Sequence, residues 1–222
     1  MRIRGAIFDM DGTLIDSLMF WDHFWGRIGA RYMNDPTFRP REEDDRRIRT
    51  MIYREGVAYI RETYRIPVPL DEFLSFAIEG LTDFYKTVAR PKEGAIALLE
   101  ALRERGIPIC LASATTRQEV LAALEYHGML GYFTAVLSCA DIGVGKDRPD
   151  IYLAALEALG LAPEEACVFE DSYVALETAK AVGLRTVGIF DRYNFGQDRL
   201  RAASEIYLGE GESLATLIAS IE

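Results

Sequence analysis

The sequence has 222 residues, half of them apolar, which is enough to bury one large core or a core with a smaller second unit. Its formal net charge of −10, without a basic tail, argues against nucleic acid or an anionic membrane as the main partner. No stretch is apolar over the length of a membrane span, and the first residues lack the apolar run of a signal peptide. The three cysteines, Cys110, Cys139 and Cys167, lie in or beside apolar runs and form no CxxC pair, which predicts buried, reduced thiols in a cytoplasmic protein.

The first apolar run ends in two carboxylates. Residues 6–8 are followed by Asp9, Asp11 and Gly12, a pattern typical of a buried strand that stops at a turn. Because side chains two apart share one face of an extended chain, Asp9 and Asp11 can point into the same space. Two carboxylates that close need a cation, a shared proton or strong hydrogen bonds, and carboxylate oxygens are ligands that Mg²⁺ prefers. The stretch alone is compatible with a magnesium site and equally with an ordinary Asp-Gly turn.

Between Ser17 and Val88 the apolar residues recur at a spacing of three to four, which predicts a small helical bundle inserted after the first strand. The three stripes consist of Trp21, Phe24, Trp25, Ile28 and Tyr32, then Ile48, Ile52, Tyr59 and Ile60, then Phe73, Ala77, Leu81, Phe84 and Val88. We interpret these stripes as core rather than as a cofactor site. The mixed charges of residues 39–47 are interpreted as a solvated face from which an arginine could still reach a site.

After Arg90 the pattern alternates between strands and helices. Pro91 is interpreted as the first residue of a helix with the apolar stripe Ile96, Leu99 and Leu102, and Thr116 and Glu119 match a capping box at the start of the next helix. Strands are expected at 107–112, 135–138, 166–169, 186–190 and, at the edge, 206–208, and further helices at 151–159, 173–182 and 214–221. This alternation predicts an α/β protein with a doubly wound parallel sheet covered on both faces.

Polar residues follow four of the expected strands. They are Asp9 and Asp11 after the first strand, and Ser113, Thr115 and Thr116, with Ala114 between them, after the second. Lys146 lies in the loop after the third strand, and Glu170 and Asp171 follow the fourth. Open parallel sheets bring such residues together beyond the carboxyl ends of the strands. Acids for a divalent cation, a hydroxyl group and a lysine are what phosphoryl transfer requires.

Each of these residues also has a purely structural interpretation. Ser113 could be only a helix-start residue, and Lys146 an ordinary lysine in a polar loop. Glu170 and Asp171 could complement the dipole of the helix that follows them.

With these four motifs in order, the chain resembles the haloacid dehalogenase-like superfamily, in the subgroup that includes phosphoglycolate phosphatases and β-phosphoglucomutase-like proteins. The resemblance implies a Rossmann-like core domain formed by residues 1–16 and 89–222, with a helical cap domain at 17–88. It also implies a Mg²⁺-dependent phosphatase for a small phosphorylated metabolite. The chain has Asp147 where the family commonly has proline directly after the lysine.

The resemblance further implies a role for each motif residue. Asp9 is expected to be the nucleophile that forms an aspartyl-phosphate, and Asp11 the general acid and base. Asp9, the backbone carbonyl of Asp11 and Asp171 are expected to hold Mg²⁺, with Glu170 in support. The expected phosphoryl contacts come from Gly12, Ser113, Ala114 and Lys146. In addition, Asp16 is interpreted as part of a hinge and Ser17 as a candidate site contact.

The alternative function is a phosphosugar mutase of the β-phosphoglucomutase type. That relative has a histidine shortly after the start of the cap, where this chain has Trp21, with His23 two residues later, and the mismatch disfavours the mutase. Dehalogenation needs no Mg²⁺, so Glu170 and Asp171 argue against it. A phosphonatase would need a Schiff-base lysine in the cap, where Lys86 is the one lysine available.

A non-catalytic binding role is disfavoured because all four motifs are retained. The sequence leaves open phosphoglycolate-like, nucleotide and sugar phosphates as substrates, and it does not indicate an oligomeric state.

Overall fold

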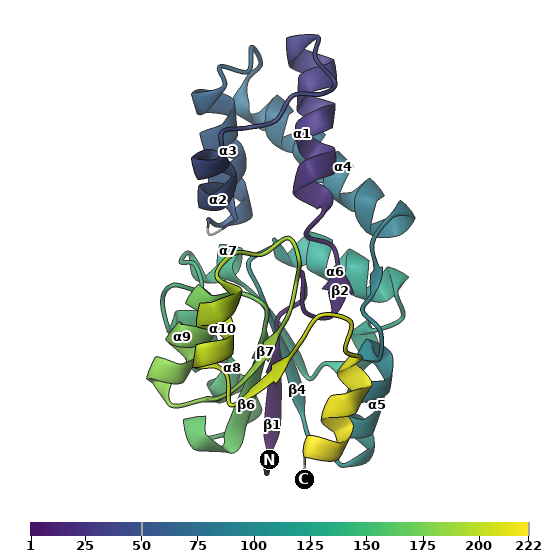
Figure 1. Ribbon diagram of the computed structural model, residues 1–222, viewed down its shortest axis with the longest axis vertical. Helices are drawn as coiled ribbons and strands as arrows, with labels where there is room; N and C mark the ends of the chain where they lie inside the picture. Colours follow the sequence, from purple (N-terminus) through teal and green to yellow (C-terminus); the bar gives the residue numbers. More distant parts are fainter. Residues whose placement is uncertain (50, 222) are drawn as a thin grey trace.

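A six-stranded parallel sheet forms the centre of the structure, a computed structural model that describes residues 1–49 and 51–221 (Figure 1). The strand order is β5-β4-β1-β6-β7-β8, and every neighbouring pair is parallel. The strands are β1 (Gly5–Phe8), β4 (Ile109–Ser113), β5 (Ala135–Ser138), β6 (Ala166–Glu170), β7 (Arg185–Ile189) and β8 (Ile206–Leu208). The predicted α/β class with a doubly wound sheet is confirmed.

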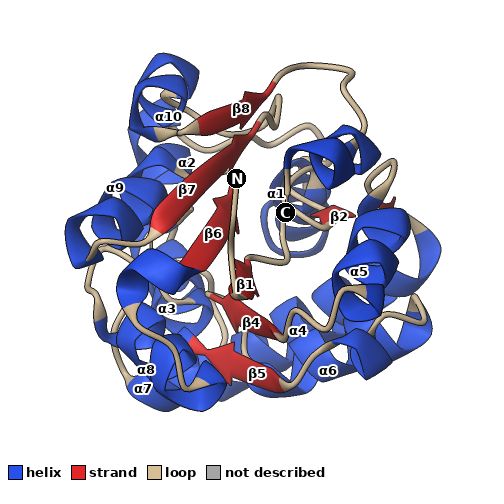
Figure 2. Ribbon diagram, turned by 90° about the horizontal axis from the view of Figure 1, so that it is seen from below, coloured by secondary structure: helices blue, strands red, loops and turns tan. Residues whose placement is uncertain are grey.

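Helices cover both faces of this sheet (Figure 2). Successive side chains of β1 point to opposite sides, so Ile7 belongs to one hydrophobic cluster while Ala6 and Phe8 belong to another. The Phe8 ring stacks on that of Phe169, with the ring centres 4.1 Å apart. One face is covered by α8 (Asp150–Leu159), α9 (Tyr173–Val182) and α10 (Gln197–Ala203), and the other by α5 (Ala95–Glu104), α6 (Arg117–Tyr126) and the 3₁₀ helix Leu214–Ser220. Shorter elements are α7 (Cys139–Ile142) and the 3₁₀ turns Leu130–Tyr132 and Pro163–Glu165.

The helical segment, which we define as residues 17–88, lies beyond the carboxyl ends of the strands (Figure 1). It contains α1 (Phe20–Ile28), a π-helical turn (Gly29–Met33), α2 (Glu42–Ile48), α3 (Tyr53–Thr63) and α4 (Leu70–Thr87). Most of its predicted apolar stripes are buried, including Phe24, Trp25 and Phe73. The division into a core domain and a cap domain stays a prediction, and the predicted ranges include Thr50 and Glu222, which lie outside the described residues.

Two short strands connect the helical segment to the rest of the chain. The segment is entered through β2 (Ile15–Asp16) and left through β3 (Arg90–Pro91), and the two strands pair in antiparallel fashion. Asp16 lies opposite Arg90 in this pair, so the structure puts both connections side by side at the position interpreted as a hinge.

Several local predictions are wrong. Pro91 lies in β3 rather than in the first turn of a helix, because its missing N–H and fixed backbone angle also suit the edge of a two-residue strand. The next helix starts later, at Ala95, so Ile96 is 44% exposed, and the buried stripe is instead Ala95, Leu98, Leu99 and Leu102. Val88 follows the end of α4 and is 39% exposed.

The predicted capping box does not form either. Thr116 precedes α6, but its side chain makes no capping hydrogen bond. Glu119 is buried, and this burial raises the pKa of its carboxyl group. The side chain thus faces the interior rather than the start of the helix. The last predicted helix, at 214–221, is present as a 3₁₀ helix.

Among the described residues, no helix has the length and apolar composition needed to cross a bilayer.

Candidate active site

A tight turn follows β1 and carries the first two carboxylates. The N–H groups of Leu14 and Ile15 both donate to the carbonyl of Met10, and the N–H of Gly12 donates to the carbonyl of Ile15 at 2.8 Å. Gly12 has a φ of +84°, and a Cβ atom on it would lie 2.4 Å from Oδ2 of Asp171. Glycine is therefore needed here both for the backbone angle and for the close approach of Asp171.

Three buried carboxylates meet at the carboxyl ends of β1 and β6. One oxygen each of Asp9, Glu170 and Asp171 lies within 4.8 Å of the others, and no other carboxylate of the described residues joins this group. Lys146, from the loop before α8, forms ion pairs with Asp9 and, at 2.8 Å, with Glu170. Its side chain is only 10% exposed. The structure thus brings together four of the residues singled out from the sequence.

The charges of this cluster perturb one another. Burial raises the pKa of Asp9 well above its ordinary value, in spite of the opposing charge of Lys146. Burial also raises the pKa of Asp171 to about 8, with the charge of Glu170 adding to it. For the Lys146 ammonium, burial alone would lower the pKa, but the carboxylates of Asp9 and Glu170 outweigh it and raise the pKa well above the ordinary value. The raised pKa values mean that these buried carboxyl groups resist being ionised together, and a divalent cation would favour their ionised forms.

The Asp11 side chain lies apart from the three-carboxylate group and accepts hydrogen bonds from hydroxyl groups. Ser17 and Tyr85 both donate to its Oδ1 at 2.7 Å, and Thr115 donates to its Oδ2 at 2.9 Å. Ser17 therefore contacts a site residue, as the sequence suggested. Thr115 was among the residues expected at this edge of the sheet, although the sequence indicated no role of its own for it. Tyr85 was not singled out, since it lies on an apolar helix.

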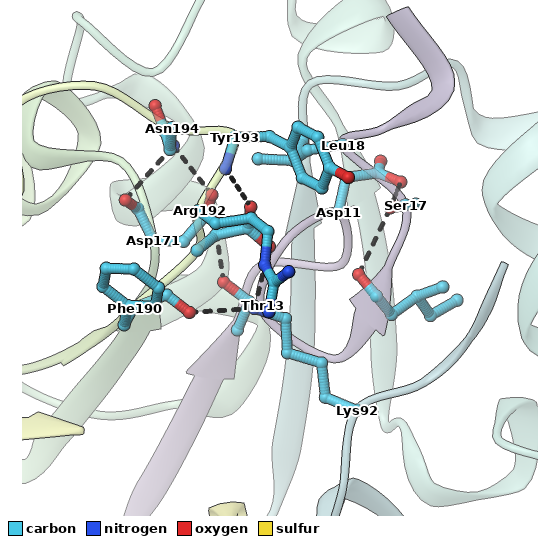
Figure 3. Close-up of polar contacts among 12 residues, drawn as sticks. Asp11, Thr13, Ser17, Leu18, Lys92, Asp171, Phe190, Arg192, Tyr193 and Asn194 are labelled. Atoms are coloured by element: carbon cyan, nitrogen blue, oxygen red, sulfur yellow. Dashed lines mark hydrogen bonds and ion pairs between the residues drawn. The ribbon is translucent and has the colours of Figure 1, made fainter. Parts of the chain in front are cut away.

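The Asp171 carboxylate is held by Thr13, a residue of the first motif for which the sequence indicated no role, and by Asn194, which the sequence analysis missed (Figure 3). Thr13 donates from Oγ1 to Oδ1 of Asp171 at 3.1 Å, and the side-chain amide of Asn194 donates to Oδ2 at 2.7 Å. Asn194 lies in the loop that follows β7. The other site residues were located just beyond the ends of four strands, and the same rule applied to this fifth strand would have found Asn194.

A second lysine, Lys92, lies close enough to Asp171 for its charge to act on that carboxyl group. Lys92 forms an ion pair with Asp191 at 2.9 Å. It also donates to the carbonyl of Phe190 at 3.0 Å (Figure 3). The Asp191 carboxylate is buried and contributes to the raised pKa of Asp171, whereas Lys92 opposes it. Lys92 therefore offsets part of the negative charge behind the cluster.

The site opens into a cavity of about 140 Å³ between the sheet and the helical segment. Ala114, Thr115 and Lys146 line it from the sheet side. Ser113 itself is fully buried, and its Oγ accepts a hydrogen bond from the N–H of Thr115 at 3.0 Å. The helical segment contributes mainly aromatic and apolar side chains, namely Phe20, Trp21, Ile48, Met51, Ile52, Tyr53, Leu81 and Tyr85.

One cation also reaches the cavity from the helical segment. This is Arg49, two residues beyond the charged residues 39–47. It forms an ion pair with Asp45 at 3.0 Å and donates hydrogen bonds to the carbonyls of Leu18 and Tyr193 at 3.3 Å. Its contact with Tyr193 joins the helical segment to the loop after β7.

Comparison with known proteins assigns the chain to a family. A family model described as haloacid dehalogenase-like hydrolase matches residues 3–183. The chain belongs to this family. The match includes β1, the helical segment and the acidic pair at the end of β6, and the resemblance expected from the four motifs is confirmed.

Two members of the haloacid dehalogenase-like family resemble the chain over most of its length. It is 30% identical over 216 residues to a phosphorylated carbohydrates phosphatase from Thermotoga maritima, covering 97% of this chain and 98% of that protein. It is 28% identical over 220 residues to a phosphoglycolate phosphatase from Shigella dysenteriae, covering 88% and 84%. A solved structure, CbbY from Rhodobacter sphaeroides in complex with phosphate, is 25% identical with a TM-score of 0.80, covering 97% and 96%.

The donor set of this family member fits Mg²⁺. Asp9, Glu170 and Asp171 offer hard carboxylate oxygens within reach of one ion, which is the ligand type Mg²⁺ takes. Thr13 and Asn194 orient Asp171 by donating hydrogen bonds to its carboxylate, as is common for carboxylates that bind a metal. The fit involves three of the predicted ligands, Asp9, Asp171 and Glu170. The fourth, the Asp11 backbone carbonyl, and the binding of an ion at this site stay predictions.

Proposed function

We propose that the protein is a Mg²⁺-dependent phosphatase that hydrolyses a small phosphomonoester through an aspartyl-phosphate on Asp9. The observation that carries this proposal is the buried group of Asp9, Glu170 and Asp171 in contact with Lys146 at the floor of a cavity. The names of the relatives support it, because two of them are phosphatases of phosphorylated carbohydrates and of phosphoglycolate. We further propose residues 1–16 and 89–222 as a core domain and 17–88 as its cap.

In the first step a carboxylate oxygen of Asp9 bonds to phosphorus, and the bond from phosphorus to the ester oxygen breaks. The ester oxygen takes the proton of the Asp11 carboxylic acid and leaves as an alcohol. Lys146 lies against Asp9 and balances negative charge on the nucleophile and on the incoming phosphoryl oxygens.

In the second step water attacks the phosphorus of the aspartyl-phosphate and gives a proton to the Asp11 carboxylate. The bond from Asp9 to phosphorus breaks, inorganic phosphate is released, and both aspartates return to their starting protonation states. The net reaction consumes one water and yields one alcohol and one phosphate.

Three further residues bind the phosphoryl group in this proposal. The Ser113 hydroxyl accepts a hydrogen bond from Thr115, so its own O–H is left to donate to a phosphoryl oxygen. Ala114 lines the cavity, and Gly12, which lies against the Asp171 carboxylate, would offer its backbone to the phosphoryl group. Asp9, the Asp11 carbonyl and Asp171 would hold Mg²⁺ with Glu170 in support, and the ion would supply positive charge to the phosphoryl oxygens.

The second candidate is the phosphosugar mutase, and it is favoured by one relative. A solved structure of a Thermotoga maritima protein described as a candidate β-phosphoglucomutase is 28% identical with a TM-score of 0.78, covering 98% of this chain and 99% of that one. Against the mutase, the aromatic Trp21 lines the cavity, whereas His23 is exposed and is not among the described lining residues. Conversion of β-glucose 1-phosphate to glucose 6-phosphate without release of phosphate would favour the mutase.

The phosphatase is tested by phosphate release from p-nitrophenyl phosphate with Mg²⁺, for the wild type and for Asp9→Asn. We expect the variant to lose turnover, because an amide is a poor nucleophile toward phosphorus. Asp71→Asn is the matched control, since the Asp71 carboxylate is 93% exposed on α4. Equal rates for the wild type and Asp9→Asn would overturn the mechanism.

A further inference from the structure

Three hydroxyl groups from three separate parts of the chain converge on Asp11. Ser17 follows β2, Tyr85 lies in the last turns of α4, and Thr115 follows β4. All three donate to the Asp11 carboxylate, at 2.7, 2.7 and 2.9 Å. Of the three, only Tyr85 comes from the far end of the helical segment, 74 residues from Asp11 in sequence.

The Tyr85 hydroxyl acts as a fixed donor. Tyr85 is only 3% exposed, and its hydroxyl lies 2.7 Å from Oδ1 of Asp11. An ionised carboxylate can only accept hydrogen bonds, so the phenol O–H is the donor in this contact. The end of α4 is tied to the turn that carries Asp11, because β3 pairs with β2 and the N–H of Lys92 donates to the carbonyl of Leu14 at 2.8 Å.

The donors are distributed unequally over the two carboxylate oxygens. Ser17 and Tyr85 both bind Oδ1, whereas Oδ2 receives only Thr115. Each carboxylate oxygen has about two acceptor positions, so Oδ1 is filled and Oδ2 keeps about one position open. An open position is where a proton can be held and exchanged.

We propose that Tyr85 is a positioning residue that fixes the Asp11 carboxylate and, together with Ser17, assigns its Oδ2 as the oxygen that exchanges the proton. This inference rests on the proposed function, in which Asp11 is the general acid and base. The proton leaves Oδ2 for the ester oxygen in the first step and returns to Oδ2 from water in the second. Without Tyr85 the carboxylate would be held by Ser17 and Thr115 alone and would rotate more readily, because the last torsion of aspartate has a broad energy minimum.

The test compares two leaving groups that differ in their need for an acid. An alkoxide such as that of glycerol 2-phosphate must be protonated as it leaves, whereas p-nitrophenolate leaves without a proton. The parameter kcat/KM reports the first irreversible step, which is transfer of the phosphoryl group to Asp9. We expect Tyr85→Phe to lower kcat/KM for glycerol 2-phosphate about tenfold, as for loss of a hydrogen bond to a charged group, and for p-nitrophenyl phosphate less than about twofold.

A double-mutant cycle with Asp11→Asn distinguishes an effect of Tyr85→Phe that acts through Asp11 from a loss of activity that does not depend on Asp11. If Tyr85 acts through Asp11, Tyr85→Phe has no further effect on cleavage of glycerol 2-phosphate once Asp11 is asparagine. Ser17→Ala removes the other donor to Oδ1 and should produce the same dependence on the leaving group. It also serves as the second variant if Tyr85→Phe folds poorly.

The matched control is Tyr32→Phe. Tyr32 also lies in the helical segment, and its buried hydroxyl has no hydrogen-bond partner among the described residues. We expect unchanged kcat/KM values for both compounds. Thermal unfolding of each variant checks that it is folded at the assay temperature.

The outcomes separate the inference from the proposed function. Turnover of both compounds by the wild type, with equal losses for both in Tyr85→Phe and in Ser17→Ala, would overturn the positioning role and leave the phosphatase intact. Additive effects of Tyr85→Phe and Asp11→Asn would also overturn it. Failure of the wild type to release phosphate from either compound would overturn the proposed function and this inference with it.

Discussion

The side-chain amide of Asn194 lies 2.7 Å from Oδ2 of Asp171 and also donates to the Asp171 backbone carbonyl at 3.2 Å. The loop after β7 thus fixes a carboxylate that ends the neighbouring strand β6. The same loop contacts the helical segment, because Arg49 donates to the carbonyl of Tyr193. The loop after β7 therefore contacts both the acidic cluster, through Asn194, and the helical segment, through Tyr193.

Removing this contact should weaken binding of a divalent cation. Asn194→Ala leaves Oδ2 of Asp171 without its amide donor, so the carboxylate is less well oriented. Loss of such a supporting contact typically lowers metal affinity about 10- to 100-fold. Calorimetric titration with Mg²⁺ measures the change, and Gln118→Ala, at an exposed position of α6, is the control. An unchanged Mg²⁺ affinity would mean that Asn194 does not support a ligand.

The raised pKa of Asp171 predicts how stability depends on pH when metal is removed. Burial, with the charges of Glu170 and Asp191, raises this pKa to about 8. The folded state therefore holds the proton more tightly than the unfolded state. The stability from this group is complete below the unfolded value and is lost as the pH rises through 8.

We therefore expect the unfolding temperature in EDTA to fall from about pH 5 to about pH 8 and to level off above that, and to fall less for Asp171→Asn. Mg²⁺ binds the ionised carboxylate, so the stabilisation that it provides should grow with pH over the same range. Thermal unfolding with EDTA and with Mg²⁺ measures both effects. Identical pH profiles of the wild type and Asp171→Asn would contradict this interpretation.

The sequence predicted the sheet well because its strands are continuous apolar runs. Residues 135–138 and 206–208 and the helix at 173–182 have the predicted bounds. The pair of β2 and β3 could not be foreseen, since Arg90 and Pro91 become a strand only by meeting Ile15 and Asp16. Local patterns contain no signal for a two-residue strand of that kind.

The site was predictable to the extent that it lies at strand ends. Asp9, Lys146 and Asp171 were found in this way, and the structure brings them together. Tyr85 was not, because its helical spacing indicates core, and only the folded chain directs its hydroxyl to Asp11. The role of each residue in catalysis stays a prediction.

The buried carboxylate of Asp44 is expected to stabilise the helical segment, away from the acidic cluster. This carboxylate is 2% exposed and accepts hydrogen bonds from Tyr59 at 2.5 Å, Tyr64 at 2.6 Å and Arg41 at 2.8 Å. Burial alone would raise its pKa, but the two tyrosine hydroxyls and Arg41 outweigh burial and lower it. The stability that it provides is therefore present above the unfolded value and is lost as the pH falls through the folded one.

We expect Asp44→Asn to lower the free energy of unfolding at neutral pH by about 2 kcal/mol, because three donors lose a charged acceptor. Denaturant unfolding at a series of pH values measures the effect, and the difference from the wild type should shrink in acid. Asp71→Asn, at an exposed position, should change stability little. A loss of stability that persists undiminished in acid would show that the charge of Asp44 is not its source.

Gly12 provides a test of how closely the turn after β1 approaches the acidic cluster. A Cβ atom at this position would lie 2.4 Å from Oδ2 of Asp171 and 2.9 Å from Cδ1 of Leu18, so Gly12→Ala must displace the Asp171 carboxylate. Gly106→Ala is the matched control, since Gly106 also has a positive φ, +68°, but a Cβ there meets nothing within 4 Å. Both variants force alanine into a left-handed conformation, which costs about 1 kcal/mol of stability. Only Gly12→Ala should also lose Mg²⁺ affinity and phosphate release. Equal activities of the two variants would mean that the Asp171 carboxylate can be displaced without an effect on the reaction.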